Sequence, residues 1–137
     1  MLQLMKKNIL FVCIENSNRS QMAEALAMKH GKERIAAFSA GSKPSGKINP
    51  KAIAAMRELG YDLSQYHSKS LREIPDIEYD YAILMGCGDE CPFVKARHHE
   101  DWDIPDPREM NEEDFRNVRN LIEQKVISLL ERLQSEV

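Results

Sequence analysis

The feature that most constrains this chain is an abrupt change of pattern within the stretch ILFVCIENSNRSQMAEALA, residues 9–27. Residues 9–14 form an apolar run that predicts a buried strand over 8–14, and apolar residues recur at helical spacing over residues 20–30. A buried strand that leads directly into a helix is the first half of a crossover unit, in which the next strand runs parallel to the first. The junction therefore predicts a parallel sheet covered by helices.

The rest of the chain repeats this alternation. Helices are expected from Pro50, capped by Asn49, and after the cap residue Asn111, with a less regular helical segment around 71–74. Three further strands are expected at 35–40, at 81–85 and, more weakly, between 98 and 104. We predict an α/β fold in three layers, with a four-stranded, mostly parallel sheet flanked by helices.

The composition is that of an ordinary globular domain. A length of 137 residues with 42% hydrophobic content suits one domain spanning 1–137. The net charge of -3 provides no general attraction to nucleic acids or acidic membranes, so neither is expected as a partner. The chain has three cysteines and neither a signal peptide nor a membrane-spanning run, which predicts a cytoplasmic protein with free thiols. We expect a monomer.

The loop between Cys13 and Arg19 is suited to binding an oxyanion. The N-terminus of the following helix adds partial positive charge, and the Arg19 guanidinium can bind two oxygens of a tetrahedral anion. The backbone amides that can surround the anion belong to Ile14, Glu15, Asn16, Ser17, Asn18, Arg19 and Ser20. The same field stabilises a thiolate at Cys13, and the Ser20 hydroxyl can donate to its sulfur. The alternative is that Cys13 is a small buried residue at a chance spacing.

The motif C-x5-R-S at residues 13–20 resembles the phosphate-binding loop of the low-molecular-weight tyrosine phosphatase superfamily. The resemblance includes QMAEA at 21–25, FSAG at 38–41 and the Asp106–Pro107 pair, and the chain is similar in particular to the arsenate reductase branch. It implies a flavodoxin-like sheet of strand order 2-1-3-4, with Cys13 as nucleophile, Arg19 as oxyanion ligand and Asp106 as general acid. No cofactor is expected.

Two more cysteines, Cys87 and Cys91, follow the third predicted strand. Residues four apart on a helix lie about 6 Å apart, which is within disulfide range. In the strand order that the resemblance implies, Cys13 and Cys87 leave neighbouring strands at one edge of the sheet. The resemblance then implies that Cys13 attacks arsenate, Cys87 releases arsenite by forming a Cys13–Cys87 disulfide, and Cys91 resolves that disulfide. Thioredoxin is the expected reductant, with a low-molecular-weight thiol and glutaredoxin as the alternative, and phosphate or sulfate would compete with arsenate.

A phosphatase is the main alternative function. Cys13, Arg19 and Asp106 alone suffice for hydrolysis of small phosphomonoesters or phosphotyrosine. Tyrosine phosphatases usually have aromatic residues after the Asp-Pro pair, which stack on the substrate ring. Here Arg108 and Glu109 stand in their place, and this favours a small inorganic substrate.

Two further alternatives concern the cysteines. Together with His98 or His99 they could form a zinc site, although the chain has no C-x2-C pairing and we expect no metal. A noncatalytic thiol redox sensor is the alternative from another functional class.

Support for the loop is expected from Asn16, Glu24, Ser39 and Lys69. Asn16 tolerates a left-handed backbone conformation and can fix the turn. Some relatives bind potassium beside the loop, at positions that Asn16, Glu24 and Ser39 match. Lys69 stands at the fourth, usually acidic position, and its ammonium is expected to replace the ion by pairing with Glu24. Glu15, at a position that is glycine in the commonest phosphatase loop, is expected to point outward.

Overall fold

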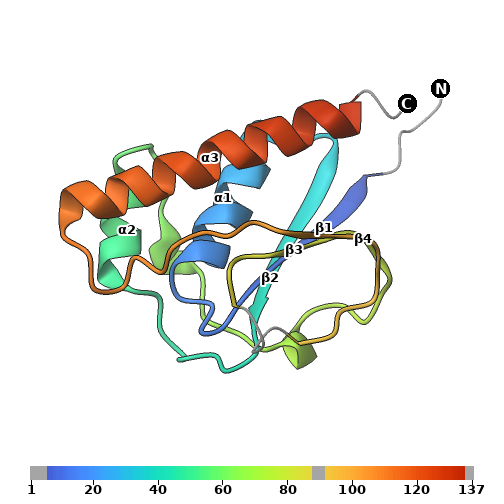
Figure 1. Cartoon of the computed structure of the whole chain (residues 1–137), viewed down its shortest axis with the longest axis horizontal. Helices are drawn as coiled ribbons and strands as arrows, with labels where there is room; N and C mark the ends of the chain where they lie inside the picture. Colours follow the sequence, from blue (N-terminus) through green and yellow to red (C-terminus); the bar gives the residue numbers. More distant parts are fainter. Residues whose placement is uncertain (1–5, 88–91, 135–137) are drawn as a thin grey trace.

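The computed structural model describes residues 6–87 and 92–134 of the chain. The strands form one sheet, with β1 (Lys7–Cys13), β2 (Ile35–Gly41), β3 (Tyr79–Leu84) and β4 (Ala96–Asp101). All neighbouring strands pair in parallel in the order β2-β1-β3-β4, which confirms the predicted topology (Figure 1). The register of β1 against β3 runs from Ile9 opposite Tyr81 to Val12 opposite Leu84, so the two strands end at the same edge.

The α-helices are α1 (Arg19–Gly31), α2 (Pro50–Arg57) and α3 (Glu112–Gln134). The predicted caps are confirmed, because Asn49 Oδ1 accepts from the Lys51 amide at 2.9 Å and Asn111 Oδ1 accepts from the Asp114 amide at 2.8 Å. Among the described residues, no helix is long and apolar enough to cross a membrane.

Some predicted elements differ in detail from the structure, and β3 covers residues 79–84 where 81–85 were predicted. The segment expected to be helical around 71–74 is a single 3-10 turn, η2 (Leu71–Glu73), preceded by another such turn, η1 (Leu63–Gln65). Ser70 and Glu73 form a complete capping box on η2, but Ile74 is already extended, as is favoured before a proline, and the turn stops there. The fourth strand starts at residue 96 rather than 98 and ends at 101.

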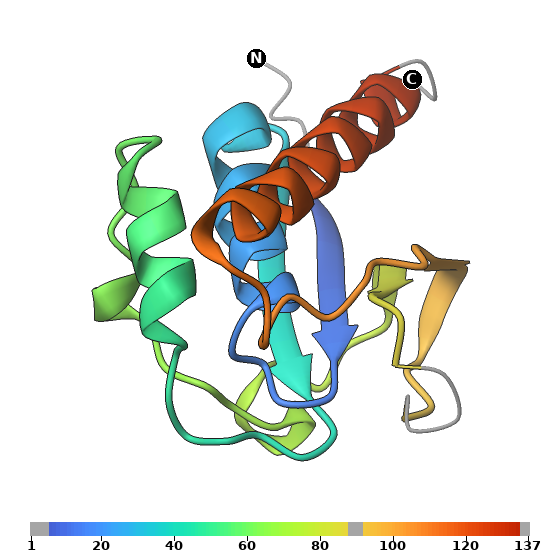
Figure 2. The same cartoon turned by 60° about the vertical axis from the view of Figure 1, so that its left-hand side comes forward.

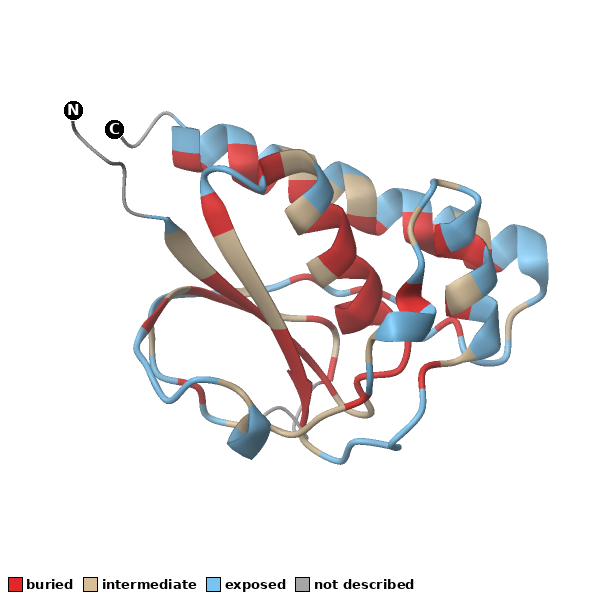
Figure 3. Cartoon of the chain, turned by 180° about the vertical axis from the view of Figure 1, so that it is seen from behind, coloured by how far each residue is buried: buried red, intermediate tan, exposed pale blue. Residues whose placement is uncertain are grey.

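The apolar core is divided between the two faces of the sheet. Side chains of β1 alternate, with Ile9 and Phe11 in the larger cluster and Leu10 and Val12 in the smaller one. All three α-helices contribute to the larger cluster and therefore cover the same face, whereas described residues from η2 and the segment before β4 pack on the other. Buried residues are concentrated in β1 and in α1, on either side of the larger cluster (Figure 3).

Trp102, directly after β4, ties this strand to the core and to α3. Its ring centroid lies 5.9 Å from that of Phe11, which confirms the prediction that it packs against the sheet. Its Nε1 donates to Glu100 Oε1 at 2.9 Å, and Arg132 of α3 donates to both oxygens of the same carboxylate. Hydrogen bonds from Arg132 and then Trp102 hold the pKa of Glu100 below its usual range, although burial opposes them.

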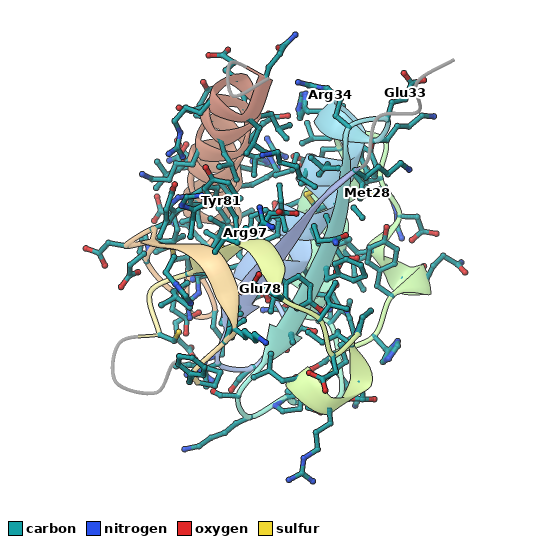
Figure 4. The ribbon with its side chains drawn as sticks, turned by 90° about the vertical axis from the view of Figure 1, so that its right-hand side faces the viewer. Met28, Glu33, Arg34, Glu78, Tyr81 and Arg97 are labelled. Carbon is teal, nitrogen blue, oxygen red and sulfur yellow. The ribbon has the colours of Figure 1, made fainter. Side chains whose placement is uncertain are left out.

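β4 carries polar side chains on both faces, because successive residues of a strand point to opposite faces, and Figure 4 shows Arg97 of β4 with Glu78 and Tyr81. Arg97 Nε lies 3.6 Å from Glu78 Oε1, and the Tyr81 ring stacks on His98 with 4.8 Å between centroids. Charges on an edge strand oppose pairing with another chain.

Tyr79 should make the protein less stable as the pH rises through the alkaline range. The residue is 3% exposed, and its hydroxyl donates to the Pro75 carbonyl at 2.7 Å. Burial, with a smaller contribution from Asp76, raises the pKa of Tyr79 from 10.0 to about 12. Between these values the native state holds a proton that the unfolded state has lost. The free energy of unfolding should therefore fall by on the order of 2 kcal/mol over this range.

We expect Tyr79→Phe to lose about 1 kcal/mol near neutral pH, because its hydrogen bond is removed. Above about pH 10 the variant should lose less stability than the wild type, because the buried phenol no longer titrates. Urea denaturation at a series of pH values measures the difference. Parallel declines in the two proteins would show that Tyr79 is not the responsible group.

Candidate active site

The candidate site lies at the carboxyl end of β1, where Cys13 ends the strand and α1 begins at Arg19. Figure 2 shows the arrowheads of β1 and β2 pointing to the same edge of the sheet, where the loop after β1 turns back into α1. The Met85 amide donates to the Val12 carbonyl at 2.8 Å, so the chain that leaves β3 passes beside the end of β1. This is the edge at which open parallel sheets bind ligands.

The Cys13 sulfur lies among hydrogen-bond donors of the loop. The thiol is free and 3% exposed. Its Sγ accepts from the Asn16 amide at 3.2 Å and lies 2.8 Å from Ser20 Oγ, the contact predicted from the sequence. The sulfur thus lies within hydrogen-bond reach of a backbone amide and a hydroxyl at the start of α1.

The loop is held open by hydrogen bonds to its outward carbonyl groups. Segments that follow β2 and precede η2 supply the donors. The Lys43 amide donates to Ile14 O at 2.8 Å, Ser68 Oγ to Glu15 O at 2.7 Å and the Asn49 amide to Ser17 O at 3.2 Å. Because a peptide unit is planar and trans, these contacts leave the loop N–H groups directed to the inside. The loop is thus preorganised for an anion.

Asn16 stabilises the turn of the loop through its backbone conformation and its side-chain hydrogen bonds. Its φ of 54° is the one positive value at a non-glycine residue in the described chain, which confirms the predicted left-handed conformation. Its Oδ1 accepts from the Lys69 amide at 3.0 Å and from Gln21 Nε2 at 2.8 Å, and its Nδ2 donates to Ser20 Oγ at 2.7 Å. Gln21 also donates to the His67 carbonyl at 2.9 Å, a supporting role that our sequence prediction did not assign to it.

Arg19 is 6% exposed and connects the loop to the neighbouring strand. Its Nη1 donates to Met85 O at 2.7 Å and to Ile104 O at 3.0 Å. These bonds orient the guanidinium, and Arg19 lines the pocket together with Cys13. The sequence predicted the anion-binding role of Arg19 but not these two backbone partners.

A pocket of about 200 Å³ joins the predicted site residues. Its lining residues are Cys13, Ile14, Glu15, Ser17, Asn18, Arg19, Asp106 and Arg108. Asp106 comes from the segment between β4 and α3, so the fold brings the predicted general acid to the pocket that holds the predicted nucleophile. Such an arrangement can bind a tetrahedral oxyanion and protonate one of its oxygens.

Glu15 lies at the edge of the pocket, and its outward orientation stays a prediction. The residue lines the pocket, and its side chain is 38% exposed. Its Oε2 accepts from Arg108 Nη1 at 2.9 Å, and this guanidinium compensates the carboxylate that would otherwise repel an anion. Because Arg108 is remote in the sequence, the pairing could not be predicted from the loop alone.

The other cysteines lie partly outside the described residues. Cys87 is 5% exposed and disulfide-bonded, and it does not line the pocket. Cys91, assigned the last thiol step, lies outside the described residues. β1 and β3 end at the same edge of the sheet, so Cys87 follows β3 at the edge where Cys13 ends β1. The reaction between the two sulfur atoms stays a prediction.

Residues 6–87 and 92–134 contain no group of three or more histidine, cysteine or acidic residues that could hold a metal ion. His99 Nε2 instead lies 2.7 Å from the Val94 carbonyl. Cys91, a member of the alternative zinc set, is outside these ranges.

A charged cluster supports the loop from the side of β2. Ser39 Oγ donates to Glu24 Oε1 at 2.6 Å, and Lys69 Nζ lies 3.3 Å from Ser39 Oγ and 3.6 Å from Glu24 Oε1. The predicted pairing of Lys69 with Glu24 is confirmed. Both side chains are about 15% exposed, so solvent screens the pair only in part.

We expect Lys69→Gln to destabilise the protein by roughly 1–3 kcal/mol, because Glu24 keeps a largely buried charge without its partner. Potassium chloride should restore more of this stability than choline chloride, since the freed oxygens can bind a small cation. Thermal unfolding in each salt measures both effects. The control is Lys29→Gln, at a residue whose ammonium lies 5.6 Å from the Tyr61 ring and outside the cluster. Equal effects of the two substitutions would contradict the role of Lys69.

Known proteins that resemble this chain in sequence and structure include arsenate reductases. The curated "Glutaredoxin arsenate reductase" of Synechocystis sp. is 38% identical over 130 residues, which cover 93% of this chain and 98% of that protein. A solved arsenate reductase in the phosphate-binding state is 37% identical, with a TM-score of 0.81 and coverage of 92% of this chain and 98% of the other. The thioredoxin-dependent arsenate reductase of Corynebacterium glutamicum is 29% identical, with a TM-score of 0.78, and the match covers 96% of this chain and 64% of that one.

A family-wide comparison covers almost the whole chain. Residues 8–137 match the family described as low molecular weight phosphotyrosine protein phosphatase. The matched region contains Cys13 at the end of β1, the anion loop and the segment with Asp106, which supply the lining of the pocket. The chain belongs to the low molecular weight phosphotyrosine protein phosphatase family.

Proposed function

We propose that this protein reduces arsenate to arsenite with electrons from thioredoxin. The observation that carries the proposal is a pocket that joins a free Cys13 to Arg19 and Asp106, while the chain leaving β3 at the same edge contains a disulfide-bonded Cys87. The pocket supplies the nucleophile and the anion site. The second thiol supplies what a phosphatase does not need, which is a route for two electrons.

The reaction begins when the Cys13 thiolate attacks arsenic(V) held by the loop amides and Arg19. A sulfur–arsenic bond forms, and one arsenate oxygen leaves as water after Asp106 protonates it. The Cys87 thiolate then attacks Cys13 Sγ. The sulfur–arsenic bond breaks, its electron pair stays on arsenic, and arsenite leaves with arsenic in the +3 state.

The remaining steps restore the nucleophile. The Cys91 thiolate attacks Cys87 Sγ, which releases Cys13 as a thiolate and leaves a Cys87–Cys91 disulfide. Thioredoxin reduces this disulfide by exchange and becomes oxidised itself. Before thioredoxin acts, Cys87 is oxidised and Cys13 is free, and Cys13 and Cys87 are in these two states here. Such chemistry belongs in a reducing cytoplasm that keeps thioredoxin supplied with electrons.

Purified, fully reduced protein tests the proposal directly. With thioredoxin, thioredoxin reductase and arsenate it should oxidise NADPH continuously, and phosphate and sulfate should inhibit. Replacing thioredoxin by glutathione and glutaredoxin should give much slower turnover. No NADPH oxidation together with rapid p-nitrophenyl phosphate hydrolysis would instead establish the phosphatase alternative, for which Cys13, Arg19 and Asp106 suffice.

A further inference from the structure

An ion pair connects two loops at the pocket. Glu15 belongs to the anion loop after β1, and Arg108 lies 93 positions later, between β4 and α3. Both residues line the cavity that Cys13 and Asp106 also line. Arg108 is 53% exposed and Glu15 38%, so their 2.9 Å contact lies toward solvent, while the Cys13 sulfur is buried. The pair therefore lies at the mouth of the pocket.

The backbone around Arg108 is held in place on both sides. Its amide donates to Asp106 Oδ1 at 3.0 Å, and its carbonyl accepts from Lys51 Nζ at 3.4 Å. The same ammonium donates to the Met110 carbonyl at 2.8 Å. Two charged side chains thus fix the position from which the Arg108 guanidinium reaches Glu15.

A free tetrahedral oxyanion and an aromatic phosphate ester differ in the space that they need at the mouth of the pocket. The loop amides and Arg19 can surround the free anion completely within the pocket. An ester places its fourth substituent, the ring, outside the anion and therefore across the mouth. We propose that the Glu15–Arg108 pair is the specificity determinant of this site, admitting small inorganic oxyanions and excluding aryl phosphates.

Because the two charges of the pair are opposite, the two single substitutions should have opposite effects on phosphate affinity. Removing Arg108 alone leaves the Glu15 carboxylate uncompensated beside an anion site, and removing Glu15 alone leaves a free guanidinium there. Arg108→Ala should therefore weaken phosphate binding by about 3- to 10-fold, while Glu15→Ala should strengthen it by a few-fold. The double variant Glu15→Ala/Arg108→Ala should bind phosphate within about 3-fold of the wild type.

The test is protection of Cys13 from iodoacetamide in fully reduced protein, followed by mass spectrometry of the Cys13 peptide. Inorganic phosphate and phenylphosphonate are the two protecting ligands. The ratio of phenylphosphonate affinity to phosphate affinity should be about 5-fold or more higher in the double variant than in the wild type, because the side chains at the mouth are removed. Arg108→Lys keeps a cation that can pair with Glu15 and should retain most of the exclusion. The control is Arg116→Ala, which breaks a 2.9 Å pair with Glu58 away from this pocket and should leave the ratio unchanged.

The inference would be overturned if the double variant had the same ratio of phenylphosphonate to phosphate affinity as the wild type. It would also be overturned if Glu15→Ala and Arg108→Ala changed phosphate affinity in the same direction. If the alanine variants unfold, Glu15→Gln and Arg108→Gln remove the charges with smaller changes of volume and test the same opposite signs. The inference rests on the proposed function for its physiological oxyanion. Protection by phosphate does not require arsenate reduction, however, so failure of turnover alone would reject the proposed function and leave the specificity result intact.

Discussion

Cys87→Ser should reduce steady arsenate turnover to background, a loss of about three orders of magnitude or more. Serine cannot accept the sulfur–sulfur bond that transfers electrons to arsenic, so the chemistry should stop with arsenic attached to Cys13. Arsenite released should stay below one equivalent per chain. The NADPH-coupled assay measures the rate, and mass spectrometry measures the adduct.

The substitution should leave the anion site intact, because Cys87 does not line the pocket. Protection of Cys13 by phosphate should therefore equal that of the wild type, whereas Cys13→Ser removes turnover and the adduct together. In arsenate-treated wild type, the peptide with Cys87 and Cys91 should lose the mass of two hydrogen atoms. Continued turnover by Cys87→Ser would eliminate the proposed electron route.

Gly86→Ala should have the second largest effect, on both oxyanion binding and stability. Gly86 has φ +84°, and a Cβ there would lie 2.8 Å from Ile104 O and 3.1 Å from Arg19 Nη1. Ile104 O accepts one of the hydrogen bonds that orient Arg19, so the methyl group would push apart the guanidinium and its anchor. We expect phosphate affinity to fall by about 100-fold and stability by roughly 2–4 kcal/mol, measured by Cys13 protection and urea denaturation.

Gly60→Ala is the matched control for this substitution. Gly60 has nearly the same φ, +87°, but a Cβ there would meet no atom within 4 Å. It should lose only the roughly 1–2 kcal/mol of a left-handed alanine and keep normal phosphate affinity. If the two variants bound phosphate equally well, contact with Arg19 would not be the reason for a glycine at residue 86.

Features that depend on neighbours in the sequence could be predicted. The strand, loop and helix around Cys13, the contact between Cys13 and Ser20, and the caps Asn49 and Asn111 each depend on a few adjacent residues. The segment at 71–74 shows the limit of such signals. Its capping box is a genuine helix start, but the proline that follows ends the turn at once.

Contacts between remote segments could not be predicted from local pattern. Arg19 reaches carbonyl groups 66 and 85 positions away, and Glu15 reaches a guanidinium 93 positions away. These partners follow from the register of β1 with β3 and from the path of the chain before α3. The family resemblance implies the strand order, whereas the contacts between individual atoms of remote segments depend on how these segments pack.

The free thiol at residue 13 has a consequence for kinetics, because it coexists with a disulfide at residue 87. Its anion loop is fully assembled in this oxidised form. An oxyanion can accordingly occupy the loop before the disulfide of Cys87 has been reduced. Inorganic phosphate can then occupy the site while Cys87 is still oxidised as well as after its reduction.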